Sequence, residues 1–227
     1  MPDNSVNWAA KILAVTRKDL VSEFRTRYAV NAVVMFALVT LTVISMSLGM
    51  MVPSTELLAA LFWIILFFAA MSGLAQVFIR EEETGTAMIL KLSSPGLTIF
   101  FGKLLFNLLL LTTLAILIVP LFIILFHSSP NNWAVFLTGL ALGVAGLAGA
   151  TTIIAAIVAR ASIKGALFTV LSFPVLAPLL IAVIEISKVG LAGGGFGDIS
   201  APLQLLVAYN VVMITVSMML FDFVWRQ

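Results

Sequence analysis

The sequence predicts an all-α polytopic membrane protein, and three observations lead to this fold class. Of the 227 residues, 62% are hydrophobic and only 10% are charged, whereas soluble domains are about half apolar and a quarter charged. Six segments are each apolar over the roughly 20 residues that a helix needs to cross a bilayer. Strand-like alternation of apolar and polar residues is absent from them. The composition therefore excludes a soluble enzyme, a disordered chain and a nucleic-acid-binding domain.

The N-terminal segment, residues 1–28, is expected to be cytoplasmic, with a helix along the membrane surface over residues 8–28. One face of this helix is apolar and carries Leu13, Leu20, Val21, Phe24 and Tyr28. The opposite face carries Lys11, Lys18, Ser22 and Arg25, and Arg17 interrupts the apolar face. The alternative is a basic topology anchor with no further role. We expect no cleavable signal peptide, since no small-residue cleavage site follows the first apolar run.

A six-helix transmembrane domain is predicted over residues 29–227. The spans follow one another continuously, so we expect them to form a single domain. The spans are expected at residues 29–52, 57–79, 104–126, 133–159, 166–184 and 203–224. The only ionisable side chain within these limits is Asp222, for which a pair with Arg226 one helical turn later is a sufficient explanation. An ion-coupled carrier is disfavoured, because such carriers keep charged groups inside the membrane.

Basic residues lie almost entirely on one side of this topology. Every Lys and Arg except Lys188 falls in the N-terminal segment, the second and fourth connections or the tail. Because cytoplasmic loops carry an excess of Lys and Arg, both termini are predicted to be cytoplasmic.

The second connection, residues 80–103, has room for a helix parallel to the membrane. Three acids are expected in the first turn of that helix, where carboxylates favour the positive dipole end: Glu81, Glu82 and Glu83. Apolar residues follow at Ala87, Met88, Leu90 and Leu92, and a turn at Ser94, Pro95 and Gly96 ends the helix. A segment that exposes acids and apolar residues suits docking onto a partner. The alternative is an amphipathic loop that is solvated at the interface.

The chain is not expected to be an enzyme by itself. A phosphate-binding loop needs G-x-x-x-x-G-K-[ST], but the nearest string has five residues between Gly96 and Gly102, and Leu104 follows its lysine. Energy must therefore come from another subunit or an ion gradient. The absence of cysteine excludes a disulfide framework and a thiolate metal site.

Inside the spans, neutral polar and small residues predict helix packing. Gln76, Asn107 and Asn210 are expected to form interhelical hydrogen bonds rather than to bind substrate. A stripe of small residues in the fourth span predicts close packing against protein: Gly139, Gly143, Gly146 and Ala150. Prolines are expected to kink or break the fifth span at Pro174 and Pro178, and the third at Pro120.

Two features lie on the outer side of the predicted topology. His127, the only histidine, could ligate haem or a metal through its imidazole, but a lone loop histidine is more often a polar loop residue. We therefore assign neither a metal site nor a bound cofactor. The last connection, residues 185–202, contains glycines from Gly193 to Gly197, and these are expected to let it dip toward the bilayer or move.

The sequence resembles the CcmB family, the haem exporter B membrane subunit of the cytochrome c maturation ABC transporter. The resemblance rests on LAVTRKDLVSEFRTR (residues 13–27), VFIREEETGTAMILKLSSPGLTIFFGKLLFNLLL (77–110), PLFIILF (120–126) and LFDFVW (220–225). The six-span order and nearly the whole length agree with the family.

This resemblance implies an ABC-2-like permease in the cytoplasmic (inner) membrane, with haem as the cargo of the complex. Two copies of the chain would combine with a CcmA-like cytoplasmic ATPase that binds ATP, with CcmC-like and CcmD-like membrane proteins and with a CcmE-like haem chaperone. By family analogy, residues 80–92 would be the coupling helix that seats in the ATPase. Its contact residues would be Arg80, Glu81, Glu82, Glu83, Gly85, Met88, Leu90 and Leu92.

Two other functions fit the same features. An ABC-type export permease for a polysaccharide, lipid or drug would share the topology and carry a different cargo. A non-transporting scaffold of a haem-handling complex would equally lack charges inside the membrane.

Overall fold

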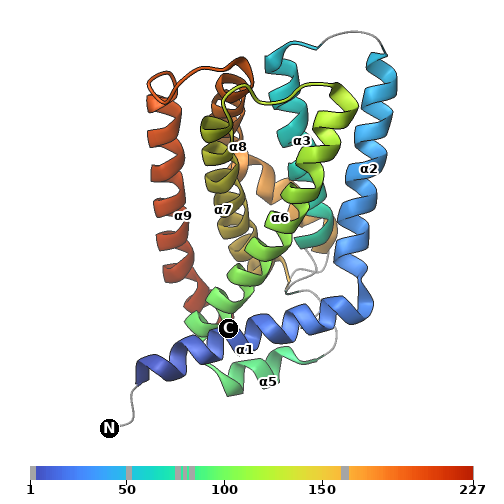
Figure 1. Ribbon diagram of the computed structural model, residues 1–227. Helices are drawn as coiled ribbons and strands as arrows, with labels where there is room; N and C mark the ends of the chain where they lie inside the picture. The colour runs from blue at the N-terminus through green and yellow to red at the C-terminus, as the bar shows by residue number, and fades with distance from the viewer. Residues whose placement is uncertain are drawn as a thin grey trace.

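The computed structural model describes residues 4–49, 53–74, 78, 81, 85–159 and 164–226, and every regular element within them is an α-helix. Six long helices form a bundle (Figure 1): α2 (Tyr28–Leu48), α3 (Thr55–Leu74), α6 (Gly96–Phe126), α7 (Trp133–Val158), α8 (Lys164–Ala192) and α9 (Ser200–Arg226). Among the described residues, all six are long and apolar enough to cross a membrane. The predicted all-α polytopic fold class is confirmed.

Two further helices lie at one end of the bundle. α1 (Asn4–Thr26) runs across that end, and α5 (Ala87–Ser93) and the C-terminus lie at the same end (Figure 1). The predicted order of an N-terminal helix, six spans and a helix in the second connection is therefore confirmed.

Two predicted span limits were wrong. α6 begins at Gly96, directly after Pro95, and not at residue 104, so Lys103 lies inside a membrane-spanning helix. α8 continues to Ala192, which also places Glu185 and Lys188 within a helix. Asp222 is therefore not the only ionisable residue in the spans. Lys103 lies beside Glu81, and Lys188 lies beside Glu185, so each of these bases has an opposite charge as a neighbour.

The junction between α1 and α2 corrects the predicted end of the surface helix. α1 stops at Thr26, Arg27 adopts a left-handed conformation with φ 51°, and Tyr28 begins α2. The backbone N–H of Val30 donates to Glu23 Oε1 at 2.9 Å, which satisfies one of the free donors at the start of α2. The chain thus turns from the membrane surface into the bundle over a single residue.

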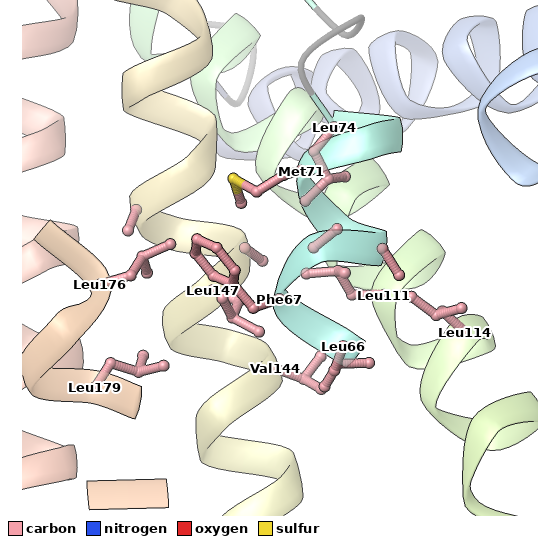
Figure 2. Packing of buried hydrophobic residues seen from close by; sticks show 14 of the residues in the cluster. Leu66, Phe67, Met71, Leu74, Leu111, Leu114, Val144, Leu147, Leu176 and Leu179 are labelled. Atoms are coloured by element: carbon pink, nitrogen blue, oxygen red, sulfur yellow. The ribbon is translucent and has the colours of Figure 1, made fainter. Parts of the chain in front are cut away.

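The core lies between α3 and α7, which are the most buried of the six spans. Figure 2 shows Phe67 and Met71 of α3 directed toward Leu147 of α7, with Leu111 of α6 and Leu176 of α8 on either side. The small-residue stripe on α7 packs closely, as predicted: a Cβ on Gly139 would lie 2.6 Å from Ile186 Cγ2, and Gly143 and Gly146 face Val183 and Leu179. Glycine at these positions brings α8 against the backbone of α7.

Polar side chains join the helices inside this apolar core. Asn107 Nδ2 donates to Thr152 Oγ1 at 2.8 Å, and Asn210 Nδ2 donates to the Leu142 carbonyl at 3.2 Å. The interhelical hydrogen bonds predicted for these two asparagines are confirmed, whereas Gln76 lies outside the described residues. A further bond that was not predicted connects α3 to α8, from Trp63 Nε1 to Ser187 Oγ at 2.8 Å.

The prolines do not break their helices, while the predicted kinks stay a prediction, and the connection between α8 and α9 is a glycine-rich turn. α8 continues through Pro174 and Pro178, and α6 continues through Pro120, so none of them breaks its helix. The glycine-rich turn after Ala192 is short and anchored: Asn132 Nδ2 donates to the Gly194 carbonyl at 2.9 Å, and Gly195 N–H donates to Asp198 Oδ2 at 2.8 Å. The turn is therefore fastened to the neighbouring outer loop.

Candidate functional site

The candidate site lies at the end of the bundle where α1, α5 and the start of α6 meet (Figure 1). Thr86 N–H, just before α5, donates to the Glu81 carbonyl at 3.0 Å. Gly85 has φ 70°, a conformation that glycine adopts without strain. α5 then ends at Ser93 because Ser94 is extended and Pro95 follows, which confirms the predicted turn.

Several predicted coupling residues lie where a partner could reach them. Met88 is 70% exposed and Leu92 is 83% exposed, and Gly85 is also on the surface, whereas Leu90 is buried. Ile89, which the sequence analysis did not single out, is exposed as well. Arg80, Glu82 and Glu83 lie outside the described residues. α5 therefore presents apolar side chains outward and is held by Leu90.

Glu81 differs from its predicted role as an exposed acid in the first turn of the helix. It precedes α5 by six residues and is only 7% exposed. Its carboxylate oxygen Oε1 lies 2.8 Å from Lys103 Nζ and also contacts Lys18 Nζ. Thr86 Oγ1 donates to its other oxygen. Glu81 is therefore committed to contacts inside the protein, and a docking partner would meet the apolar residues of α5 instead.

Four charged residues form what we call the buried ion cluster: Asp19, Glu81 and Lys103 are buried, and Lys18 lies at its exposed edge. Lys103 Nζ lies 3.0 Å from Asp19 Oδ2, and Lys18 Nζ lies 3.3 Å from Asp19 Oδ1. Lys103 Nζ also lies 5.5 Å from the centre of the Phe78 ring, within the range of a cation–π contact. The two acids balance the two bases, which offsets part of the cost of removing these charges from water. The cluster joins α1, the segment before α5, and α6.

The electrostatics of the cluster keep Glu81 and Lys18 charged. Burial by itself would raise the pKa of Glu81, but the charge and hydrogen bond of Lys103, with hydrogen bonds from Lys18 and Thr86, lower it from 4.5 to about 2. Burial lowers the pKa of Lys18, but Asp19 and Glu81 together raise it above its ordinary value. At neutral pH the segment before α5 is therefore held by full charges.

α1 is also packed tightly on the first turns of α6. A Cβ on Gly102 would lie 2.6 Å from Val15 Cγ1, so only glycine lets the two helices approach this closely. Thr16 Oγ1 donates to the Gly102 carbonyl at 3.0 Å. The Trp8 ring meets the Phe101 ring edge-on, with centroids 5.6 Å apart. Side-chain packing, a hydrogen bond and ion pairs thus fasten α1 to α6.

Asp222 lies near the end of α9, as the sequence analysis expected. Its carboxylate lies against Gly96, the first residue of α6, where a negative charge favours the positive end of the helix dipole. An aromatic group packs α6 against the end of α9. Its rings belong to Phe78, Phe100, Phe221 and Trp225. The side chain of Arg226, its predicted partner, lies outside the described set.

His127 is exposed at the opposite end of the bundle. It caps the C-terminus of α6 with φ 51°, a conformation that ends the helix. The described residues contain no group of three or more His, Cys, Asp or Glu that could hold a metal ion.

The sequence analysis missed Asp19 and Lys103 as site residues, although one signal pointed to them. Pro95 is a favourable residue at the start of a helix, and a helix that starts there carries Lys103 two turns inward, among Phe100, Phe106 and Asn107. A lysine at such a position requires a buried acid beside it. Which acid supplies the charge depends on tertiary contacts with residues 22 and 84 positions away.

Comparison with known proteins gives one family. A family model described as CcmB protein matches residues 10–224. The chain belongs to the CcmB family. The match includes the buried ion cluster, α5 and the described spans almost to the end of α9. None of the curated proteins searched matches the sequence. CcmB proteins are membrane components of the haem exporter, or cytochrome c maturation, ABC system, so the chain is a multi-pass membrane component of such a system.

Proposed function

We propose that this CcmB protein couples ATP hydrolysis on a separate ATPase subunit to rearrangement of its own membrane helices, in support of haem export or delivery for c-type cytochromes. The observation that carries the proposal is the arrangement at α5. Apolar side chains of α5 point outward at the end of the bundle, while Glu81, just before it, is held to α1 and α6.

The exposed side of α5 has the chemistry of a docking element. Met88, Ile89 and Leu92 leave apolar surface uncovered on a helix of only seven residues. Such a helix gains little stability alone, since isolated helices shorter than about 12 residues are marginal in water. An apolar groove on a partner would bury these side chains, as in other helix-in-groove complexes. A cytoplasmic ATPase is the partner expected for an ABC membrane subunit.

The attachment of Glu81, which precedes α5, to α6 provides the second half of the mechanism. A displacement of α5 by the ATPase reaches Glu81, whose ion pairs connect it to Lys103 on α6 and to Lys18 on α1. α6 runs the full length of the bundle and packs against α7, α2 and α9. Movement at one end of α6 is thereby transmitted across the membrane.

The remaining parts of the proposed complex follow from the family. We propose a second copy of the chain, the CcmA-like ATPase that carries ATP, CcmC-like and CcmD-like membrane proteins, and a CcmE-like haem chaperone. The α1 and α5 end would face the cytoplasm in the inner membrane, in keeping with the bias of basic residues. Haem is treated as cargo, and no residue of this chain is assigned as its ligand.

The test replaces the exposed apolar residues of α5. The double variant Met88→Glu, Leu92→Glu places charges on the docking surface and should abolish co-purification of the ATPase. Cells that carry this variant should then lose their c-type cytochromes. Phe196→Glu is the matched control, because Phe196 is equally an exposed apolar residue but lies in the turn at the opposite end of the bundle. Retention of the ATPase by the double variant, or equal loss in the control, would contradict the proposal.

Two further measurements, deletion of the chain and stimulation of ATP hydrolysis by haem, separate the alternatives. An export permease for a polysaccharide, lipid or drug would retain its ATPase, but deletion would leave c-type cytochromes intact. A non-transporting scaffold would hold the haem-handling proteins together without stimulation of ATP hydrolysis by haem or its chaperone. Haem-stimulated hydrolysis that the α5 variant loses distinguishes a coupling subunit from a scaffold.

A further inference from the structure

Charges on α1 are segregated between its two sides. Its acids, Asp19 and Glu23, are each only 8% exposed and face the bundle, whereas Lys11, Arg17 and Arg25 are exposed. Both acids have partners inside the protein: Asp19 pairs with Lys103, and Glu23 accepts from the Val30 N–H. The outward side of α1 therefore carries positive charge that the acids of the helix do not neutralise.

The same outward side is strongly apolar. Leu13, Val21 and Phe24 are all exposed, and Phe24 is 74% exposed. Leu13 and Val21 are each four residues from Arg17, and Phe24 is seven residues after it. At these spacings all three side chains share the face of the helix that carries Arg17. Arg17 forms no ion pair with any carboxylate in the described part of the chain. A ligand that satisfies a guanidinium at the centre of an apolar face must therefore carry both a negative charge and apolar surface.

We infer that this face of α1 binds an anionic phospholipid, with Arg17 at the headgroup phosphate and Leu13, Val21 and Phe24 against the upper acyl chains. The guanidinium presents paired N–H donors that match phosphate oxygens. α1 crosses the end of the bundle (Figure 1), so its long axis lies along the membrane surface, at the level of the headgroups. Arg25 supplies a second base toward the end of the helix.

A phospholipid accounts for both features of the surface at once. Free inorganic phosphate would satisfy Arg17 and leave Phe24 exposed, and a neutral lipid would cover Phe24 without neutralising the bases. Each base near an anionic surface contributes roughly 1 kcal/mol, which corresponds to about fivefold in affinity. The inference does not depend on the proposed ATPase coupling, because it uses only α1 and the lipid beside it.

The test measures lipid retention by native mass spectrometry. The purified full-length chain in detergent is titrated with phosphatidylglycerol and, separately, with phosphatidylcholine. We expect preferential retention of phosphatidylglycerol, a loss of about fivefold in affinity for Arg17→Gln and a larger loss for Arg17→Gln with Arg25→Gln. Lys188→Gln, which removes a base at the opposite end of the bundle, is the matched control and should bind as the wild type does.

Further arms distinguish the competing explanations. Inorganic phosphate and glycerol 1-phosphate should fail to displace the lipid, and phosphate that competes at equal concentration would indicate an ion site without a lipid. Equal binding of both lipids, or unchanged binding by the double variant, would overturn the inference. Protection of α1 from hydrogen exchange only when partner subunits are added, with no lipid preference, would also overturn it and would assign the face to a protein. Since Arg17 and Arg25 are exposed, unchanged circular dichroism should confirm that the variants fold.

Discussion

Lys103 is buried two turns inside a membrane-spanning helix, and only 1% of its surface is exposed. The loss of hydration of an ammonium group at such a position costs free energy, which only nearby acids can offset. Asp19 and Glu81 supply those acids from a surface helix and from the segment before α5. The position of one side chain therefore decides how three separate parts of the chain meet.

Lys103→Met should destabilise the protein, because it removes the buried base that Asp19 and Glu81 share and leaves only the more exposed Lys18 beside them. We expect the free energy of unfolding to fall by about 3 kcal/mol, within the range found when one partner of a buried pair is removed. Thermal unfolding followed by tryptophan fluorescence measures this change. Lys103→Arg keeps the charge and should lose much less, and Lys11→Met, at an exposed position on α1, should change little. Equal melting of the Met and Arg variants would contradict this account.

Glu81 predicts a specific pH dependence. Its pKa is lowered to about 2 in the folded protein from an ordinary 4.5, so the folded state favours the ionised carboxylate. The stabilisation is complete above pH 4.5, and it declines as the pH falls from 4.5 toward 2. The melting temperature of the wild type should therefore drop across that interval more steeply than that of Glu81→Gln. Glu56→Gln removes a carboxylate that is largely exposed, and this control should follow the wild-type curve.

At the scale of elements, α1 and α6 behave as one packed unit. The close approach at Gly102, the hydrogen bond from Thr16 and the contact of Trp8 with Phe101 act over successive turns of both helices. The sequence predicted the existence of both helices correctly, since apolar length and amphipathic spacing are local properties. It did not predict their contact, because the buried face of α1, with Val15, Thr16 and Asp19, differs from the apolar face that the helical pattern displays.

Gly102→Ala tests this packing. The added Cβ would lie 2.6 Å from Val15 Cγ1, so α1 has to shift, at a cost of about 1–3 kcal/mol for an overpacked contact. Hydrogen exchange of the α1 amides should become faster while exchange in α7 is unchanged. Gly149→Ala is the matched control, because its Cβ would meet only Ile214 Cγ1, at 3.9 Å. Slow exchange of α1 in both variants would show that the contact is not tight.

At the scale of the whole molecule, the two ends of the bundle differ in chemistry. α1, α5 and the C-terminus occupy one end (Figure 1), where the buried ion cluster also lies, and His127 and the glycine-rich turn occupy the other. A base-rich end is expected to face the cytoplasm. The pairing of Lys18 and Lys103 with acids does not remove this asymmetry, because the exposed bases of α1 remain.

The orientation can be measured by labelling of single cysteines, because the natural sequence contains none. Met88→Cys and Phe196→Cys introduce exposed thiols at opposite ends. In intact cells a membrane-impermeant maleimide should label only the Phe196 variant, and Met88→Cys should react after the membrane is opened. The reverse pattern would invert the predicted topology, and labelling of both in intact cells would exclude it.

The sequence alone determined that this chain spans a membrane six times, with a basic surface helix, a helical second connection and a family resemblance that the comparison confirms. These properties depend on the composition and spacing of neighbouring residues, because each apolar helix is favourable in the bilayer independently of the others. Only the tertiary structure decided that Glu81 is an internal anchor, that Asp222 meets the start of α6 and that Lys103 is a shared partner. A buried charge is stable only beside its opposite, and the chain brings those opposites together from positions far apart in sequence.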